Sequence, residues 1–177
     1  HLVPIFRNER IEEVYWTYGY SPVFDDDGSI GGTLVVCTET TARVVWERRS
    51  RSLGALAAAL THANDVESML RQAADVLQQS ANDVPFALLY MQTGEGEQIE
   101  LVESIGVSRD QARQLLGAEL SSAAQLQQLR SAADSGEPMP AQIQLPGTPW
   151  PEPVRQLFTV ALRKQRDQSA SGFLVFG

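Results

Sequence analysis

Apolar and polar positions alternate along the N-terminal part of the chain with the two-residue period of β-strands. Residues 11–24 are dense in β-branched and aromatic side chains, the composition of a strand, and residues 2–7 are a candidate third strand. The Asp27-Gly28 pair supplies the positive-φ residue of a tight hairpin, and residues 30–37 return as the second strand. The pattern predicts an antiparallel hairpin, which cannot make a stable domain alone.

From residue 42 the apolar positions recur in three- and four-residue steps, which is typical of a helix with one buried face. Residues 42–63 predict a linker helix. Its short coiled-coil stripe is interrupted at Arg49 and consists of Trp46, Leu53, Leu56, Leu60 and Ala63. Asn64 and Glu67 stand at the spacing of a capping box, so we expect a bend near Asn64 and a second helix that runs through residue 80.

The rest of the chain mixes strand and helix patterns. Residues 86–91 are an unbroken apolar run, which predicts a central strand buried on both faces. Ser108 and Gln111 are spaced as a capping box before a short helix that ends at residue 116. The other predicted elements are a turn over 93–96, strands over 98–105, 141–145, 157–163 and 172–176, a helix over 123–133, and an irregular proline-rich segment over 146–153. The predicted fold class is α+β.

The composition narrows the function classes. Hydrophobic residues make up 43% of the 177, which is enough for real cores, and the formal net charge of -8 disfavours nucleic acids and anionic membranes as partners. No apolar stretch approaches the ~20 residues of a membrane span, and no signal peptide is visible. We therefore expect a cytoplasmic protein without membrane insertion. Because the first residue is not Met, we also expect the chain to be cut from a longer one.

Few residues are candidates for catalysis, metal binding or disulfide formation. The single cysteine, Cys37, excludes an internal disulfide and a cysteine-based metal cluster, and its place in an apolar strand predicts a small core residue in a reducing compartment. Of the two histidines, His1 and His62, neither stands in a kinase phospho-acceptor pattern. The acidic run Asp25–Asp27 lacks the further ligands of a calcium loop. We expect no catalytic residue, no metal and no cofactor.

The N-terminal pattern resembles a family of sensory domains. The features that carry the resemblance are residues 15–23 (YWTYGYSPV), the Asp-Asp-Gly hairpin, Gly31-Gly32 and the exit Glu39-Thr40-Thr41-x-Arg43. They resemble the C-terminal half of a PAS domain, here residues 1–41, whose last strand ends in an Asp-x-Thr-type motif that caps the outgoing helix. The resemblance implies a signal junction formed by Glu39, Thr41 and Arg43. It also implies that the ligand-holding helices of the family lie before His1.

Residues 64–177 resemble a second sensory family. The features, in chain order, are the helix over 66–80, the segment 83–90, the strand over 99–106, Ser135-Gly136-Glu137-Pro138, Pro149-Trp150-Pro151-Glu152-Pro153 and the closing residues 172–177. Together they resemble a GAF domain with an antiparallel sheet. The resemblance implies a small-molecule pocket for which Tyr90, Glu103 and Trp150 offer polar or stacking groups; alternatively, Tyr90 and Trp150 are ordinary core or lid aromatics. The C-terminal helix of the family would fall after Gly177, so one face of the sheet is expected to be incompletely covered.

A PAS domain followed by a GAF domain is similar to the sensory region of a bacterial sensor histidine kinase, often a hybrid one. This resemblance implies a region that is not itself an enzyme and passes a signal along the linker helix to a kinase domain in the same parent chain. We expect a parallel homodimer with Trp46, Leu53, Leu56 and Leu60 at its seam, unless these residues pack back onto the GAF-like sheet. Two alternatives stay open: the same module regulating a phosphatase or a cyclic-dinucleotide enzyme, and a stand-alone GAF-type small-molecule-binding enzyme.

Overall fold

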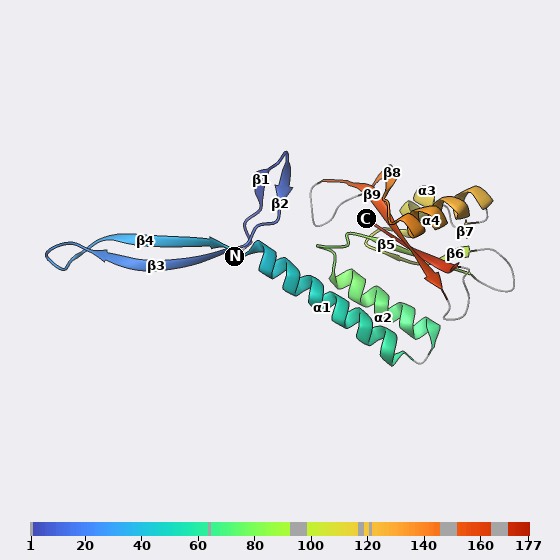
Figure 1. Ribbon diagram of the computed structural model, residues 1–177, viewed down its shortest axis with the longest axis horizontal. Coiled ribbons are helices and arrows are strands. Elements are labelled where there is room, and N and C mark those ends of the chain that lie inside the picture. The colour runs from blue at the N-terminus through green and yellow to red at the C-terminus, as the bar shows by residue number, and fades with distance from the viewer. Residues whose placement is uncertain are drawn as a thin grey trace. The chain divides into compact units, whose positions relative to one another are not determined.

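The chain is α+β, as predicted, and it divides into two compact units, residues 1–53 and 54–177 (Figure 1). The computed structural model describes residues 2–63, 65–92, 99–116, 119–120, 122–145, 152–163 and 170–177. Within these ranges there are four helices and three antiparallel sheets. No helix in the described part of the chain is long and apolar enough to cross a membrane.

The first unit contains two separate two-stranded sheets. Strands β1 (Ile5–Arg7) and β2 (Arg10–Glu12) form one, and β3 (Trp16–Phe24) and β4 (Ile30–Glu39) form the other. The prediction of one continuous strand over residues 11–24 is therefore wrong. The strand breaks before Trp16 because the backbone of Tyr15 bonds to Thr40 and Thr41, where the chain leaves β4 and enters a helix.

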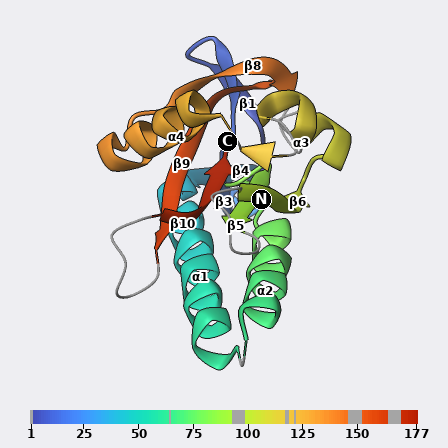
Figure 2. The same ribbon diagram turned by 90° about the vertical axis from the view of Figure 1, so that its right-hand side faces the viewer.

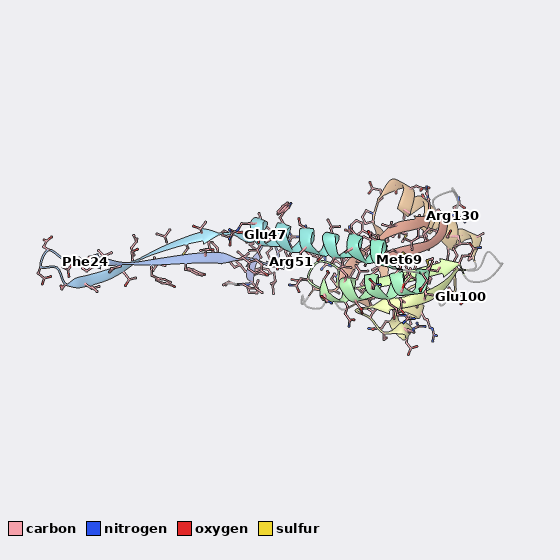
Figure 3. The ribbon with its side chains drawn as sticks, turned by 90° about the horizontal axis from the view of Figure 1, so that it is seen from below. Phe24, Glu47, Arg51, Met69, Glu100 and Arg130 are labelled. Carbon is pink, nitrogen blue, oxygen red and sulfur yellow. The ribbon has the colours of Figure 1, made fainter. Side chains whose placement is uncertain are left out.

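The hairpin of β3 and β4 turns as the Asp-Gly pair predicts. Gly28 has a φ of 83°, and the Asp27 carboxylate accepts hydrogen bonds from the Ser29 backbone N–H at 2.9 Å and from its hydroxyl at 2.6 Å. Side chains project from both faces of this ribbon, including Phe24 near its tip (Figure 3). Cys37 is exposed on β4, so the prediction that it is a core residue is wrong: among the described residues, no second layer covers this part of the hairpin.

Two consecutive helices follow, α1 (Thr41–His62) and α2 (Val66–Gln79), as the three- and four-residue spacing predicts. The predicted N-cap at Asn64 is wrong, and Asn64 itself lies outside the described residues. Asp65 is the N-cap because its backbone is extended and its carboxylate accepts the Ser68 N–H at 2.7 Å. Ser68 takes the third position of the capping box that was predicted for Glu67.

The second unit is built on a six-stranded antiparallel sheet in the order β7-β6-β5-β10-β9-β8. These strands are β5 (Ala87–Gln92), β6 (Ile99–Ile105), β7 (Glu119–Leu120), β8 (Met139–Leu145), β9 (Val154–Arg163) and β10 (Ala170–Phe176). The predicted central strand is β5, which lies between β6 and β10 and is buried from Ala87 to Tyr90. The predicted turn over 93–96 and most of the proline-rich segment lie outside the described residues.

Helices α3 (Arg109–Leu116) and α4 (Ala123–Ser135) cover one face of this sheet, and α2 lies on the opposite side (Figure 2). The predicted cap of α3 is confirmed, since Ser108 and Gln111 exchange hydrogen bonds of 2.9 and 3.2 Å. Helix α4 ends at Ser135 and is capped by Gly136, whose backbone is left-handed with a φ of 71°. The core between these helices and the sheet includes Leu88, Tyr90, Leu115, Leu129, Leu157, Phe173 and Val175.

Among the described residues, the α2 side of the sheet is only partly covered. On β9, Phe158 and Val160 are 40% and 46% exposed. The Phe158 ring stacks on Phe176 of β10 with centroids 5.9 Å apart. Apolar side chains on a sheet normally pack against a second layer, so this half of the sheet presents an uncovered apolar surface in the described part of the chain.

Candidate functional site: the junction between strand and helix

The predicted signal junction lies where β4 ends and α1 begins. The Thr41 hydroxyl oxygen accepts a hydrogen bond from the Tyr15 backbone N–H at 3.0 Å, and its hydroxyl donates to the Glu39 carboxylate at 2.9 Å. The Thr40 N–H donates to the Tyr15 carbonyl oxygen at 2.8 Å. The start of α1 is thus tied both to its own strand and to the segment that connects β2 with β3. We call residues 13–15 the connecting segment below.

Arg7 on β1 bridges two carboxylates of the junction. It donates to Glu12 and lies 3.4 Å from Glu39. Glu12 also accepts hydrogen bonds from Asn8 at 3.1 Å and from Arg10 at 3.2 Å. The Arg7 guanidinium, followed by the Asn8 amide, holds the pKa of Glu12 at about 2. The Thr41 hydroxyl and then Arg7 lower the pKa of Glu39.

A second ion pair joins the connecting segment to the body of α1. Both terminal nitrogens of Arg48 donate to the Glu13 carboxylate, Nη2 to Oε2 at 2.9 Å. The Tyr15 hydroxyl donates to Glu13 Oε1 at 2.7 Å. The side chains of Arg48 and Glu13 are only 20% and 12% exposed. Burial, then the hydrogen bond to Glu13, raises the pKa of Tyr15.

The structure brings Glu39 and Thr41 together and places Arg43 elsewhere. Arg43 lies 4.0 Å from Glu47 in a surface ion pair along α1, and its side chain is 69% exposed. The positive charges at the junction come instead from Arg7 and Arg48, which the sequence patterns did not single out. Their partners Glu39 and Glu13 are 32 and 35 residues away along the chain, so no local spacing could reveal these pairs.

The arrangement is suited to holding elements together. Carboxylates whose pKa is lowered by guanidinium and hydroxyl donors stay ionised at neutral pH, which makes them poor general acids and bases. Among the described residues no group of three or more His, Cys, Asp or Glu side chains is placed to hold a metal ion.

Of the three predicted ligand-binding residues, the structure describes Tyr90 and Glu103, and it places them on different faces of the sheet. Tyr90 is fully buried in the core of the second unit, and this burial raises its pKa to about 12. Glu103 on β6 is half-buried and pairs with Leu89, the neighbour of Tyr90. Paired residues share a face and successive residues alternate, so Tyr90 and Glu103 point to opposite faces of the sheet. Trp150 lies outside the described residues.

A different hollow lies between α4 and the start of β8. It has a volume of about 470 Å³ and is lined mostly by small and uncharged side chains, among them Gln127, Gln128, Ser131 and Met139. Neither Tyr90 nor Glu103 is among its described lining residues. It is an open depression, and its described lining contains no buried charged group to orient a ligand.

The predicted dimer residues on α1 are divided between two environments. Trp46, Leu53 and Leu60 are 70%, 67% and 58% exposed, whereas Leu56 is half-buried and its neighbour Ala59 is buried. The three exposed residues are spaced by seven, so they form one stripe along the helix, which we call the α1 stripe. Of the three, only Leu60 lies in the same compact unit as the sheet, and it is 58% exposed.

In comparisons with known proteins, no family model matches the sequence, and no curated protein and no solved structure shows significant similarity to it.

Proposed function

We propose that this chain is the sensory and relay region of a bacterial sensor histidine kinase, with no enzymatic activity of its own. Residues 1–41 would be the C-terminal half of a PAS-like domain, residues 42–63 the relay helix, and residues 64–177 a GAF-like domain. The region passes a signal through a homodimeric helix to a kinase domain in the same parent chain. The sequence features described above support this assignment, and the α+β fold is compatible with it.

The observation that carries the proposal is the two-sided character of α1. One side of the helix is bound to the connecting segment of the first unit through Thr41 and Arg48. The other side presents the α1 stripe to solvent. A helix that is held by a folded unit and exposes seven-residue apolar spacing is suited to pairing with a second copy of itself. Pairing then converts a movement of the strands into a movement of the dimer.

The α+β fold of the second unit is compatible with a small-molecule sensor. Tyr90 is fully buried in the core and is not accessible to a ligand. A ligand site would therefore lie on the uncovered face of the sheet or in the hollow beside α4. The same module could equally control a phosphatase or a cyclic-dinucleotide enzyme, since the junction and the α1 stripe contain nothing specific to the output domain.

The test is phosphorylation of the full-length parent with labelled ATP. We expect acid-labile phosphohistidine in the parent and none on residues 1–177 alone. Leu53→Glu with Leu60→Glu should abolish the labelling because both charges fall on the α1 stripe. Ala58→Glu, also exposed on α1 but on another side, is the matched control and should keep it. A parent that hydrolyses phosphate esters or condenses nucleotides, without labelling, would refute the kinase assignment.

A further inference from the structure

We infer that Glu13 and Arg48 are the positioning residues of the relay: their ion pair fixes which side of α1 faces the strands and therefore where the α1 stripe points. The contact itself is observed within the first unit. Its consequence for signalling rests on the proposed function.

A helix that is held only at its first residue can pivot. Thr41 is the first residue of α1, and its hydroxyl oxygen accepts the Tyr15 N–H. Arg48 lies seven residues further, which is almost two turns and about 10 Å along the axis. We call Thr41 and Arg48 the two anchors of α1. Because both anchors bind the connecting segment, together they fix the rotation of the helix about its axis and its tilt.

The anchors and the α1 stripe lie on different sides of the helix. At about 100° per residue, Thr41 and Arg48 differ by only ~20° around the axis, while Trp46 lies roughly 140–160° from both. Burial follows the same division: Thr41, Val45, Arg48 and Ser52 are half-buried, whereas Trp46 and Leu53 are exposed. Rotating α1 off its anchors would therefore turn the α1 stripe by the same angle.

The geometry of the pair is more specific than that of a surface ion pair. Arg48 uses both terminal nitrogens on both oxygens of Glu13, and the Tyr15 hydroxyl fixes the same carboxylate from a third direction. By contrast, Arg43 and Glu47 are 69% and 52% exposed, and they lie on one helix, so they cannot hold α1 against the strands. They provide a matched control for charge reversal.

The experiment measures the position of α1 relative to β4 in the isolated chain. Spin labels are placed on the native Cys37, the single cysteine, and on Ser50→Cys, an exposed position of α1. Pulsed electron paramagnetic resonance gives the distribution of distances between them, with excess unlabelled protein to suppress distances between copies. The variants are Glu13→Arg, Arg48→Glu, both together, and the control pair Arg43→Glu with Glu47→Arg.

We expect each single reversal to broaden the distribution to about twice the width of the parent, because one anchor then remains. The double reversal should restore a narrow distribution, and the control should not change it. An unchanged width in the single variants, or broadening that the double reversal does not repair, overturns the inference. If a reversed variant loses its helical circular dichroism, Glu13→Gln and Arg48→Gln carry the same test.

Phosphorylation of the full-length parent separates this inference from the proposed function. Suppose that the single reversals broaden the distance distribution and change the labelling of the parent, and that the double reversal restores both. The inference about Glu13 and Arg48 and the proposed relay function are then both supported. If the distance distribution changes but the labelling does not, the positioning role of Glu13 and Arg48 is supported and the relay function is refuted. If the distances do not respond, the anchor is refuted whatever the labelling shows.

Discussion

Glu12 shows how the strength of a charge at the junction depends on its neighbours. It accepts hydrogen bonds from Arg7, Asn8 and Arg10, and the first of these is the main reason its pKa is about 2. A carboxyl group whose pKa is lower in the folded state than in the unfolded state stabilises the fold only while it is ionised. The contribution of Glu12 to the stability of the junction should therefore be lost in strong acid.

The first prediction is an acid-dependent loss of stability that is due to Glu12. Its contribution is present above the ordinary pKa of 4.5 and is lost as the pH falls through about 2. Urea unfolding, followed by tryptophan fluorescence to which Trp16 and Trp46 of the same unit contribute, should show stability falling over this interval. Glu12→Gln should be less stable at neutral pH and show a flatter acid dependence. Glu9→Gln, at an exposed position on the turn between β1 and β2, is the control; equal slopes in both variants would contradict the prediction.

The contribution of Tyr90 to stability depends on pH in the opposite sense, because it is lost at high pH. Burial raises its pKa to about 12, so the folded state keeps it neutral after the unfolded chain has begun to ionise it near pH 10. We predict that stability is unaffected by Tyr90 below that point and is lost as the pH rises towards 12. Tyrosinate absorbance should show a late-titrating step that is lost in Tyr90→Phe, whereas a late contribution from Tyr15, whose pKa is also raised, should remain. Tyr20→Phe, an exposed position, should leave that late step in place.

At the scale of elements, periodicity predicts most of the fold. The apolar run around β5, the alternation in β6 and the three- and four-residue spacing in α1 and α2 are local properties, and each element formed close to its expected bounds. The predictions that were wrong concern residues whose conformation or burial is determined by contacts with residues far away in the sequence. The connecting segment leaves the strand because its backbone bonds to residues beyond β4, and Cys37 stays exposed because the described chain offers no layer to bury it.

The start of α2 is a place where two adjacent residues compete for the same role. Asn64 and Asp65 are both favoured N-caps, and the structure selects Asp65 with Ser68. We predict that Asp65→Ala lowers the free energy of unfolding by about 1 kcal/mol, because the Ser68 N–H at 2.7 Å loses its acceptor. Asp65→Ser keeps a capping oxygen and should recover most of the loss. Thermal unfolding followed by circular dichroism measures both; an Asp65→Ala variant as stable as the parent would show that the cap contributes nothing.

At the scale of the whole molecule, the sequence indicated where the junction lies but only some of the residues that form it. Glu39 and Thr41 were found because they are neighbours in a short motif. Arg7, Glu13 and Arg48 were missed because they meet only after the first unit has folded. Similarly, periodicity placed Leu56 on the seam with Leu53 and Leu60, whereas the fold turns Leu56 partly inward beside the buried Ala59. Periodicity identifies a helix face, and packing decides how much of that face remains exposed.

The last prediction concerns self-association through the α1 stripe. Each large apolar side chain contributes roughly 1.5–3 kcal/mol when it is fully buried, so three residues on each copy support a dimer with a dissociation constant in the micromolar range or weaker. Sedimentation equilibrium should show a monomer–dimer equilibrium for the parent. Leu53→Glu should give a folded monomer, because it places a charge on a residue that is 67% exposed. Ala58→Glu should still dimerise. Leu56→Glu is a poorer choice, since Leu56 is half-buried and its substitution would also lower stability.

The orientation of the two helices can be tested with one further cysteine. In a parallel pair Ala57 lies opposite its own copy, next to the α1 stripe, whereas in an antiparallel pair centred on Leu53 it lies opposite Arg49. With Cys37→Ser to remove the native thiol, Ala57→Cys should therefore form a disulfide-linked dimer under mild oxidation only if the helices are parallel. Parallel pairing would bring the two copies of whatever follows α1 together, as a relay to paired output domains requires. A dimer that sediments as such but never cross-links at Ala57→Cys would show that the copies associate in another orientation.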